Sequence, residues 1–113
     1  MSIRLTKTSK YKAIRTECDG ITFASKKEAS RYAELKLLER AGEISGLVLQ
    51  PKFDMVVSGV KVCRYIADFM FTDARTGKVI VEDVKSAFTK TIREYTIKKR
   101  LMLAVYGIEI HEV

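Results

Sequence analysis

The spacing of apolar residues along the chain predicts two helices. Residues 25–41 carry an apolar stripe at helical spacing, and their first four residues, Ser-Lys-Lys-Glu, fit a capping box. Gly42 follows the expected end of this helix. Residues 89–106 form the second predicted helix, and Gly107 follows it.

Two of the expected strands form an antiparallel hairpin. Residues 62–72 alternate in the way a strand requires, with Asp68 as the only charge between Tyr65 and Thr72. The turn at 73–77 contains aspartate and glycine and leads into a strand at 78–85.

The remaining strands complete an α/β pattern. Residues 48–57 form a strand that Pro51 interrupts, residues 108–113 form the last strand, and a short strand at 21–23 precedes the first helix. The main order is therefore helix, three strands, helix, strand. This order predicts an α/β fold in which helices pack on a mixed central β-sheet, within one domain that spans residues 13–113.

The charge of the chain points to a polyanionic partner. The formal net charge is +7, and residues 1–16 hold five basic and no acidic side chains. Residues 90–100 hold another five basic side chains, against Glu94 alone. Residues 1–12 are expected to form a mobile basic arm. Nucleic acid is the favoured partner, although basic residues can also serve only to keep a small protein in solution.

Composition argues against a membrane protein and a zinc site. The longest stretches without a charge are eight residues, 44–51 and 101–108, whereas a membrane-spanning helix needs about 20 apolar residues. Cys18 and Cys63 have no CxxC spacing, and His111 is the only histidine. Residues 1–16 do not read as a signal peptide. The two cysteines favour a reducing, cytoplasmic setting over a single disulfide between them.

Three charged residues at the hairpin form the candidate chemical site. Asp83 and Lys85 project from the same face of their strand, and Asp68 lies on the neighbouring strand. The two carboxylates can share Mg²⁺, and the ammonium can stabilise charge that develops on a phosphate. Two explanations without a catalytic role remain: a structural salt bridge between Asp68 and Lys85, or a solvated strand end.

These residues also resemble a known motif. Asp68, followed fifteen residues later by Asp83-Val84-Lys85, is similar to the motif of the PD-(D/E)XK nuclease superfamily, whose core has the same order of helices and strands. Five segments in order resemble a small phage- and prophage-encoded family assigned to that superfamily: DGITFASKKEASRYAELKLLERAGEI, LQPKF, YIADF, VEDVK and YGIEIHEV. The resemblance implies a restriction-endonuclease-like core.

The resemblance also assigns roles to individual residues. It implies that Asp68 and Asp83 bind Mg²⁺, for which Mn²⁺ can substitute, together with the backbone carbonyl of Val84. Lys85 would be the catalytic lysine. Glu28 matches an extra acidic residue that binds the metal directly or through water, but it equally fits the capping box.

Three further positions qualify this assignment. Gln50 is a polar site residue by weaker analogy, and a loop residue otherwise. Ala67 stands where the superfamily's name has proline. Glu82 would replace Asp83 in the motif only if a β-bulge shifted the register.

The implied function is a Mg²⁺-dependent endonuclease that cuts DNA by shape rather than by sequence, in phage recombination, replication or packaging. Resolution of a Holliday junction would need a homodimer, and the setting would be the cytoplasm of a bacterial host. Phosphate contacts are expected from basic side chains on both helices: Lys26, Lys27, Lys90, Arg93, Lys98 and Arg100. The alternatives are a non-enzymatic nucleic-acid-binding protein and an inactive subunit with a nuclease fold.

Overall fold

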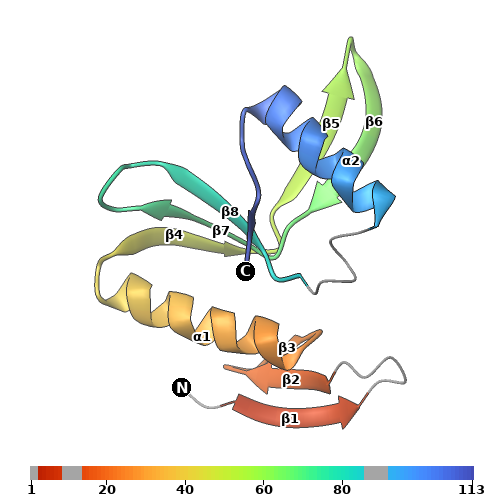
Figure 1. Cartoon of the computed structure of the whole chain (residues 1–113). Helices are drawn as coiled ribbons and strands as arrows, with labels where there is room; N and C mark the ends of the chain where they lie inside the picture. The colour runs from red at the N-terminus through yellow and green to blue at the C-terminus, as the bar shows by residue number, and fades with distance from the viewer. Residues whose placement is uncertain (1–2, 9–13, 86–91) are drawn as a thin grey trace. The chain divides into compact units, whose positions relative to one another are not determined.

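The computed structural model describes residues 3–8, 14–85 and 92–113 of the chain (Figure 1). The chain divides into two compact units, Met1–Ile44 and Ser45–Val113, whose positions relative to one another are not determined. Helices and a multi-stranded mixed sheet are both present, which confirms the α/β class. In the described ranges, no helix combines the length and the apolar character needed to cross a membrane.

The first unit contains a three-stranded antiparallel sheet. Its strands lie in the order β1 (Ile3–Thr8), β2 (Ile14–Cys18), β3 (Ile21–Phe23). β1 lies within the segment predicted to be a mobile arm, and it pairs with β2 from Ile3 opposite Cys18. Part of the predicted arm is therefore a paired strand, and the rest, residues 1–2 and 9–12, lies outside the described residues.

The helix of the first unit, α1 (Lys26–Arg40), begins and ends where the sequence predicts. The side chain of Ser25 accepts a hydrogen bond from the backbone N–H of Glu28 at 3.1 Å, as the capping box requires. Ala29, Tyr32 and Leu35 are buried and form the apolar side of α1. The capping box and the stripe together account for this helix.

A mixed four-stranded sheet organises the second unit. Its strands lie in the order β4 (Ile44–Leu49), β7 (Phe69–Asp73), β8 (Val79–Asp83), β9 (His111–Glu112). β7 and β8 are antiparallel, as the predicted hairpin requires, whereas β8 and β9 are parallel. The last strand was predicted to run over 108–113 and is shorter. Because β9 is parallel to β8, the ends of both strands lie at the same edge of the sheet.

The other two strands of this unit, β5 (Lys52–Val57) and β6 (Val60–Ile66), form a separate antiparallel hairpin. The break between β4 and β5 falls at Pro51, as predicted. The prediction of one continuous strand over 62–72 is wrong, because the chain leaves β6 and enters β7 at residues 67–68. The two breaks are bonded to each other: Gln50 N–H donates to the Asp68 carbonyl at 3.0 Å, and Ala67 N–H donates to the Pro51 carbonyl at 3.1 Å.

The second helix, α2 (Arg93–Leu101), continues into a π-helical turn, η2 (Met102–Tyr106), and ends at Gly107 with a positive φ of 69°. This agrees with the prediction over 93–106; residues 89–91 lie outside the described part of the chain. Figure 1 shows α2 beside the β5–β6 hairpin.

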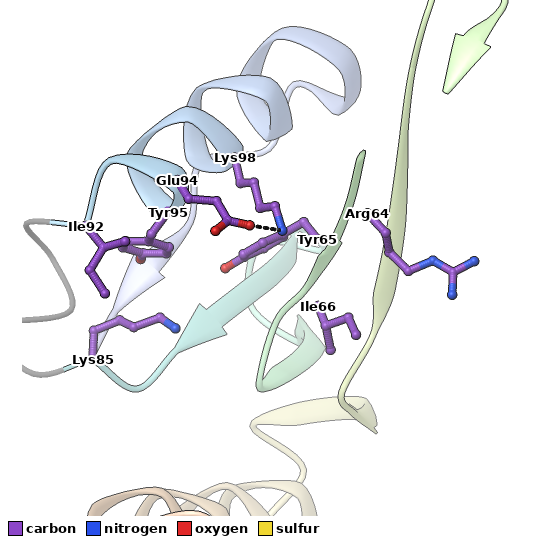
Figure 2. Close-up of a pocket in the computed structure, with 8 residues that line it drawn as sticks. All are labelled: Arg64, Tyr65, Ile66, Lys85, Ile92, Glu94, Tyr95 and Lys98. Carbon is purple, nitrogen blue, oxygen red and sulfur yellow. Dashed lines mark ion pairs between the residues drawn. The ribbon is translucent and has the colours of Figure 1, made fainter. Parts of the chain in front are cut away.

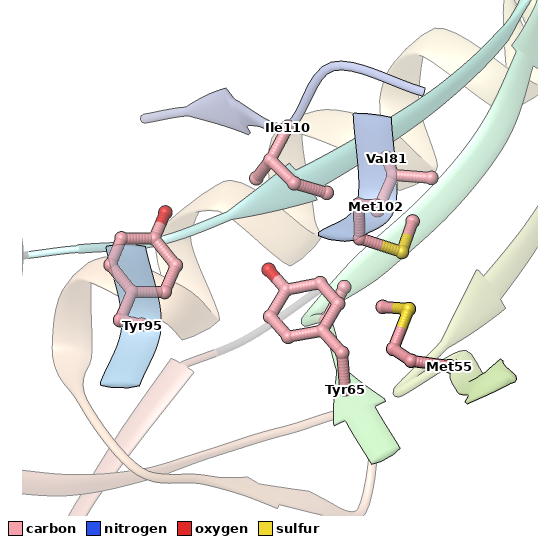
Figure 3. Packing of buried hydrophobic residues seen from close by; sticks show 7 residues of the cluster. Met55, Tyr65, Val81, Tyr95, Met102 and Ile110 are labelled. Carbon is pink, nitrogen blue, oxygen red and sulfur yellow. The ribbon is translucent and has the colours of Figure 1, made fainter. Parts of the chain in front are cut away.

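The core of the second unit lies between the β5–β6 hairpin, the four-stranded sheet and the second helix. Met55 and Tyr65 come from the hairpin, Val81 from β8, and Tyr95 and Met102 from α2 and η2 (Figure 3). All five are at most 7% exposed. Burial of a large apolar side chain stabilises a fold by about 1.5–3 kcal/mol. This packing therefore fixes α2 against the sheet and positions the side chains at the end of β8.

Candidate functional site

The ends of β7 and β8 bring the two predicted aspartates together. Asp68 precedes β7 and Asp83 is the last residue of β8, and the antiparallel register pairs Phe69 with Glu82. The backbone N–H of Asp68 donates to Asp83 Oδ1 at 3.0 Å, and the N–H of Val84 donates to Asp68 Oδ2 at 2.8 Å. One oxygen of each carboxylate is thus fixed by the backbone of the opposite strand.

Lys85 completes the arrangement that the sequence predicts. Its Nζ lies 3.8 Å from Asp83 Oδ2, in ion-pair contact but beyond hydrogen-bond length. The Asp83 side chain is 1% exposed, and its Oδ2 has no hydrogen-bond partner in the described structure. Two backbone hydrogen bonds join this strand end to Val113. The Lys85 N–H donates to the Val113 carbonyl at 3.2 Å, and the Val113 N–H donates to the Asp83 carbonyl at 2.9 Å.

Burial dominates the electrostatics of both acids. It raises the pKa of Asp83 to about 6, against the opposing effects of Lys85 and the Asp68 N–H, while the nearby Glu112 raises it further. Burial also raises the pKa of Asp68, although the Val84 N–H and Lys85 both act to lower it. The surroundings therefore compensate only part of the negative charge of the two carboxylates when both are ionised.

The predicted alternative at Glu82 is not observed. β7 and β8 pair without a register shift from Phe69 opposite Glu82 to Thr72 opposite Val79. Because side chains alternate along a strand, Glu82 points to the opposite face from Asp83. Asp83 is the residue that faces Asp68 and Lys85.

Gln50 reaches the site through its backbone. It is exposed and has a positive φ of 51°, a conformation that residues other than glycine seldom adopt. Its N–H donates to the Asp68 carbonyl, so the strained residue supports the backbone that carries Asp68. For Val84 the structure shows the N–H contact with Asp68, and the role of its carbonyl as a ligand stays a prediction.

The other predicted residues are distributed over both units. Glu28 lies in the first unit, where its N–H takes part in the α1 cap; its role as a metal ligand stays a prediction. Lys26 and Lys27 are exposed at the start of α1. In the second unit Arg93 and Arg100 are exposed, and Lys98 is partly buried on α2. Lys90 lies outside the described residues.

Three residues that the sequence did not assign to the site also lie in it. The Tyr95 hydroxyl donates to Glu112 Oε2 at 2.9 Å, and Lys99 Nζ lies 3.2 Å from Glu112 Oε1. Lys85 Nζ lies 4.8 Å from the centre of the Tyr95 ring. Burial, followed by the bond to Glu112, raises the pKa of Tyr95. The parallel pairing of Glu112 with Asp83 was the missing signal, because it joins residues far apart in the sequence.

A pocket of about 290 Å³ opens beside Lys85, between the end of β6 and the start of α2. Figure 2 shows the side chains of Lys85 and Tyr95 on one side of it and the Glu94–Lys98 ion pair, 3.1 Å long, on α2. The residues that line it are Arg64, Tyr65, Ile66, Lys85, Ile92, Glu94, Tyr95 and Lys98. Lys85, which contacts Asp83, therefore borders a space whose other lining side chains are mostly aromatic, aliphatic or basic.

The donor set fits a hard divalent cation that keeps several waters. Among the described side chains, no group of three histidine, cysteine or acidic residues is arranged to hold a metal. Mg²⁺ is commonly bound by one or two carboxylates plus water and substrate oxygens, which Asp68 and Asp83 can supply. The buried Asp83 Oδ2 has no hydrogen-bond partner among the described residues, and it is the atom that such a cation would contact.

Residues 8–111 match the family model described as "Protein of unknown function (DUF1064)", and the chain belongs to this family. No curated protein and no solved structure matches the chain.

Proposed function

We propose that this member of the DUF1064 family is a metal-dependent endonuclease with a restriction-endonuclease-like core, which hydrolyses phosphodiester bonds in DNA. One observation carries the proposal. A carboxylate oxygen of Asp83 is buried without a hydrogen bond from the described residues, beside a second acid and an ammonium group. Burying an uncompensated charge costs several kcal/mol, and a cation at this position would offset that cost.

The two aspartates and Lys85 have distinct roles in this proposal. Asp68 and Asp83 would hold the cation, helped by the Val84 carbonyl, because the backbone N–H contacts fix the orientation of both carboxylates. A bound Mg²⁺ would polarise a phosphoryl oxygen and lower the pKa of a coordinated water. Lys85 would place its ammonium against the negative charge that develops on the phosphate.

Charge counting also supports a cation. Two ionised aspartates and one lysine leave one negative charge in a buried setting, and Glu112 adds to the repulsion on Asp83. The Lys99 ammonium compensates Glu112 at 3.2 Å. A divalent ion would offset this negative charge and leave one net positive charge to attract a phosphate, and its binding would release any proton held on Asp83.

The basic side of α2 supports DNA as the substrate. Arg93 and Arg100 are exposed on the helix whose Tyr95 contacts Lys85, and the whole chain carries a net charge of +7. Contacts from these arginines, and from Lys26 and Lys27, would bind phosphates without reading bases. We therefore propose recognition by DNA shape, and a homodimer if the substrate is a four-way junction.

The test is cleavage of a DNA panel by the purified protein in Mg²⁺ or Mn²⁺. The panel contains a plasmid, a single strand, a flap and a four-way junction. Asp83→Ala and Lys85→Ala should each abolish cleavage, and the lysine variant should still bind the metal. Asp54→Ala and Lys61→Ala are matched controls, because these residues form an exposed ion pair on the β5–β6 hairpin, and both should cut like the parent.

The competing function is a DNA-binding protein in which Asp83 and Lys85 form only a structural ion pair, as their 3.8 Å contact permits. In that case DNA binding persists in EDTA and the parent cuts none of the four substrates. Equal cleavage by the parent, Asp83→Ala and Lys85→Ala would instead show that the activity resides elsewhere.

A further inference from the structure

Tyr95 connects Lys85 to the last strand of the sheet. The residue is 7% exposed on α2, and its ring centre lies 4.8 Å from Lys85 Nζ and 5.3 Å from Lys99 Nζ. Its hydroxyl donates to Glu112 Oε2 at 2.9 Å. Ammonium groups within about 6 Å of an aromatic face are attracted by the ring quadrupole.

We infer that Tyr95 is a positioning residue, which holds the Lys85 ammonium beside Asp83 so that it meets the phosphate at the reacting position. The inference rests on the proposed nuclease function. Tyr95 acts through Lys85 and has no contact with the phosphate in this role.

The Tyr95 ring restricts the side chain of Lys85. Lysine has a flexible four-carbon stem, and ordering it costs conformational entropy. The 3.8 Å contact with Asp83 is too long for a hydrogen bond, so it does not direct the ammonium in the way a hydrogen bond would. The Tyr95 ring limits where the stem can lie, and Figure 2 shows the two side chains next to each other.

Glu112 and Lys99 in turn hold the ring. The Tyr95 hydroxyl is anchored on Glu112, whose strand pairs in register with Asp83. Glu112 is itself an acid close to Asp83 and would compete for the Lys85 ammonium. Lys99 compensates Glu112 at 3.2 Å, which reduces that competition. The order of contacts is Lys85, Tyr95, Glu112, Lys99.

This arrangement predicts a specific kinetic effect. Loss of the ring should lower kcat about tenfold, because small displacements of a catalytic group reduce the rate strongly, while KM stays within about twofold. Tyr95→Phe keeps the ring and should retain kcat within about threefold. Rescue by phenylalanine distinguishes positioning by the ring from a role of the hydroxyl.

The experiment compares Tyr95→Leu and Tyr95→Phe with the parent, using kcat and KM for DNA cleavage in Mg²⁺. Tyr95→Met replaces the leucine variant if the latter does not fold. Tyr106→Leu is the control, because Tyr106 packs its ring against Phe53 and bonds to the Asp54 carbonyl in the same unit. The control should change neither constant by more than about twofold.

A second readout needs no cleavage. In protein labelled with ¹³C-lysine, the Lys85 ε-methylene resonance is assigned by its absence in Lys85→Arg. The ring current of the aromatic side chain at position 95 should shift the Lys85 ε-methylene protons upfield in the parent and in Tyr95→Phe. This upfield shift should vanish in Tyr95→Leu. An unchanged Lys85 resonance in Tyr95→Leu overturns the inference, even if the parent cuts no DNA. Parental kcat in Tyr95→Leu overturns it equally. A parent that cuts no DNA, with the expected shifts, defeats the nuclease proposal alone.

Discussion

Replacement of Asp83 by asparagine should stabilise the protein in the absence of divalent metal. The Asp83 carboxyl is buried, and its pKa is raised from 3.8 to about 6. Asparagine has nearly the same shape, and its Oδ1 can still accept the Asp68 N–H that the aspartate accepts at 3.0 Å. The substitution therefore removes the buried charge and keeps the packing.

The magnitude follows from the pKa difference between the folded and unfolded states. Between pH 3.8 and 6 the folded state keeps a proton on Asp83 that the unfolded state has lost. The stabilisation from this group is fully present below pH 3.8 and is lost as the pH rises through 6. The difference of 6 − 3.8 = 2.2 pKa units corresponds to roughly 3 kcal/mol at about 1.4 kcal/mol per unit.

At pH 7 we expect Asp83→Asn to raise the free energy of unfolding by roughly 1–3 kcal/mol. The lower end allows for the amide group that then lies beside the Lys85 ammonium. The attraction of Lys85 for the ionised carboxylate is already contained in the raised pKa, so it does not reverse the sign.

The assay is urea unfolding in EDTA at several pH values from 4 to 8. The free energy of unfolding of the parent should decrease from pH 4 to 6, and most of that decrease should be absent in Asp83→Asn. Asp54→Asn is the control, because Asp54 is more exposed and its pKa is lowered by the hydrogen bond from Arg64. Removal of the Asp54 charge should give no stabilisation.

Either of two results would refute this reasoning. One is an Asp83→Asn variant that is less stable than the parent at pH 7. The other is a variant with the same pH dependence as the parent between 4 and 6. Each would mean that the carboxylate is better compensated in solution than its Oδ2, which has no hydrogen bond from the described residues, indicates.

Three further predictions test the surroundings of the site. Mg²⁺ at 10-fold its dissociation constant should raise the unfolding free energy of the parent by about 1.4 kcal/mol in a calorimetric melt, and an equal effect on Asp83→Asn would contradict a site at this residue. Gln50→Gly should leave the parent's stability unchanged or raise it by up to about 1 kcal/mol in urea, because glycine adopts a φ of 51° without strain, whereas Gln50→Val should lower it. Ser25→Ala should lower the unfolding free energy by about 1 kcal/mol, measured by circular dichroism in urea, because α1 loses the acceptor for the Glu28 N–H.

Local patterns were sufficient for much of the fold. The cap of α1 and the β7–β8 hairpin follow from residues close together in the sequence, and strand alternation was enough to predict that Asp83 and Lys85 share a face. The break at Asp68 could not be read in this way, because the alternating pattern continues through it. It arises from hydrogen bonds to Gln50 and to β8, which are tertiary contacts.

Sequence patterns did not reveal Tyr95, Lys99 and Glu112 as site residues for the same reason. Tyr95 is buried on α2, but its hydroxyl partner, Glu112, lies seventeen positions away in another element. Only the parallel pairing of β9 with β8 brings Glu112 beside Asp83. Single-sequence periodicity carries no information about which strands become neighbours.

Two unfavourable features of the second unit lie together at this site, and this favours a ligand-binding role over a purely structural ion pair. Asp83 buries a carboxylate oxygen without a hydrogen bond from the described residues, and Gln50, bonded to the Asp68 carbonyl, has a positive φ. Apolar side chains often replace a structural ion pair with a gain in stability, so stability alone does not explain these features. A bound cation would compensate both carboxylates. The Asp83→Asn measurement separates these cases, because a stabilised variant that has lost its response to Mg²⁺ fits only a site whose acids are balanced by a ligand.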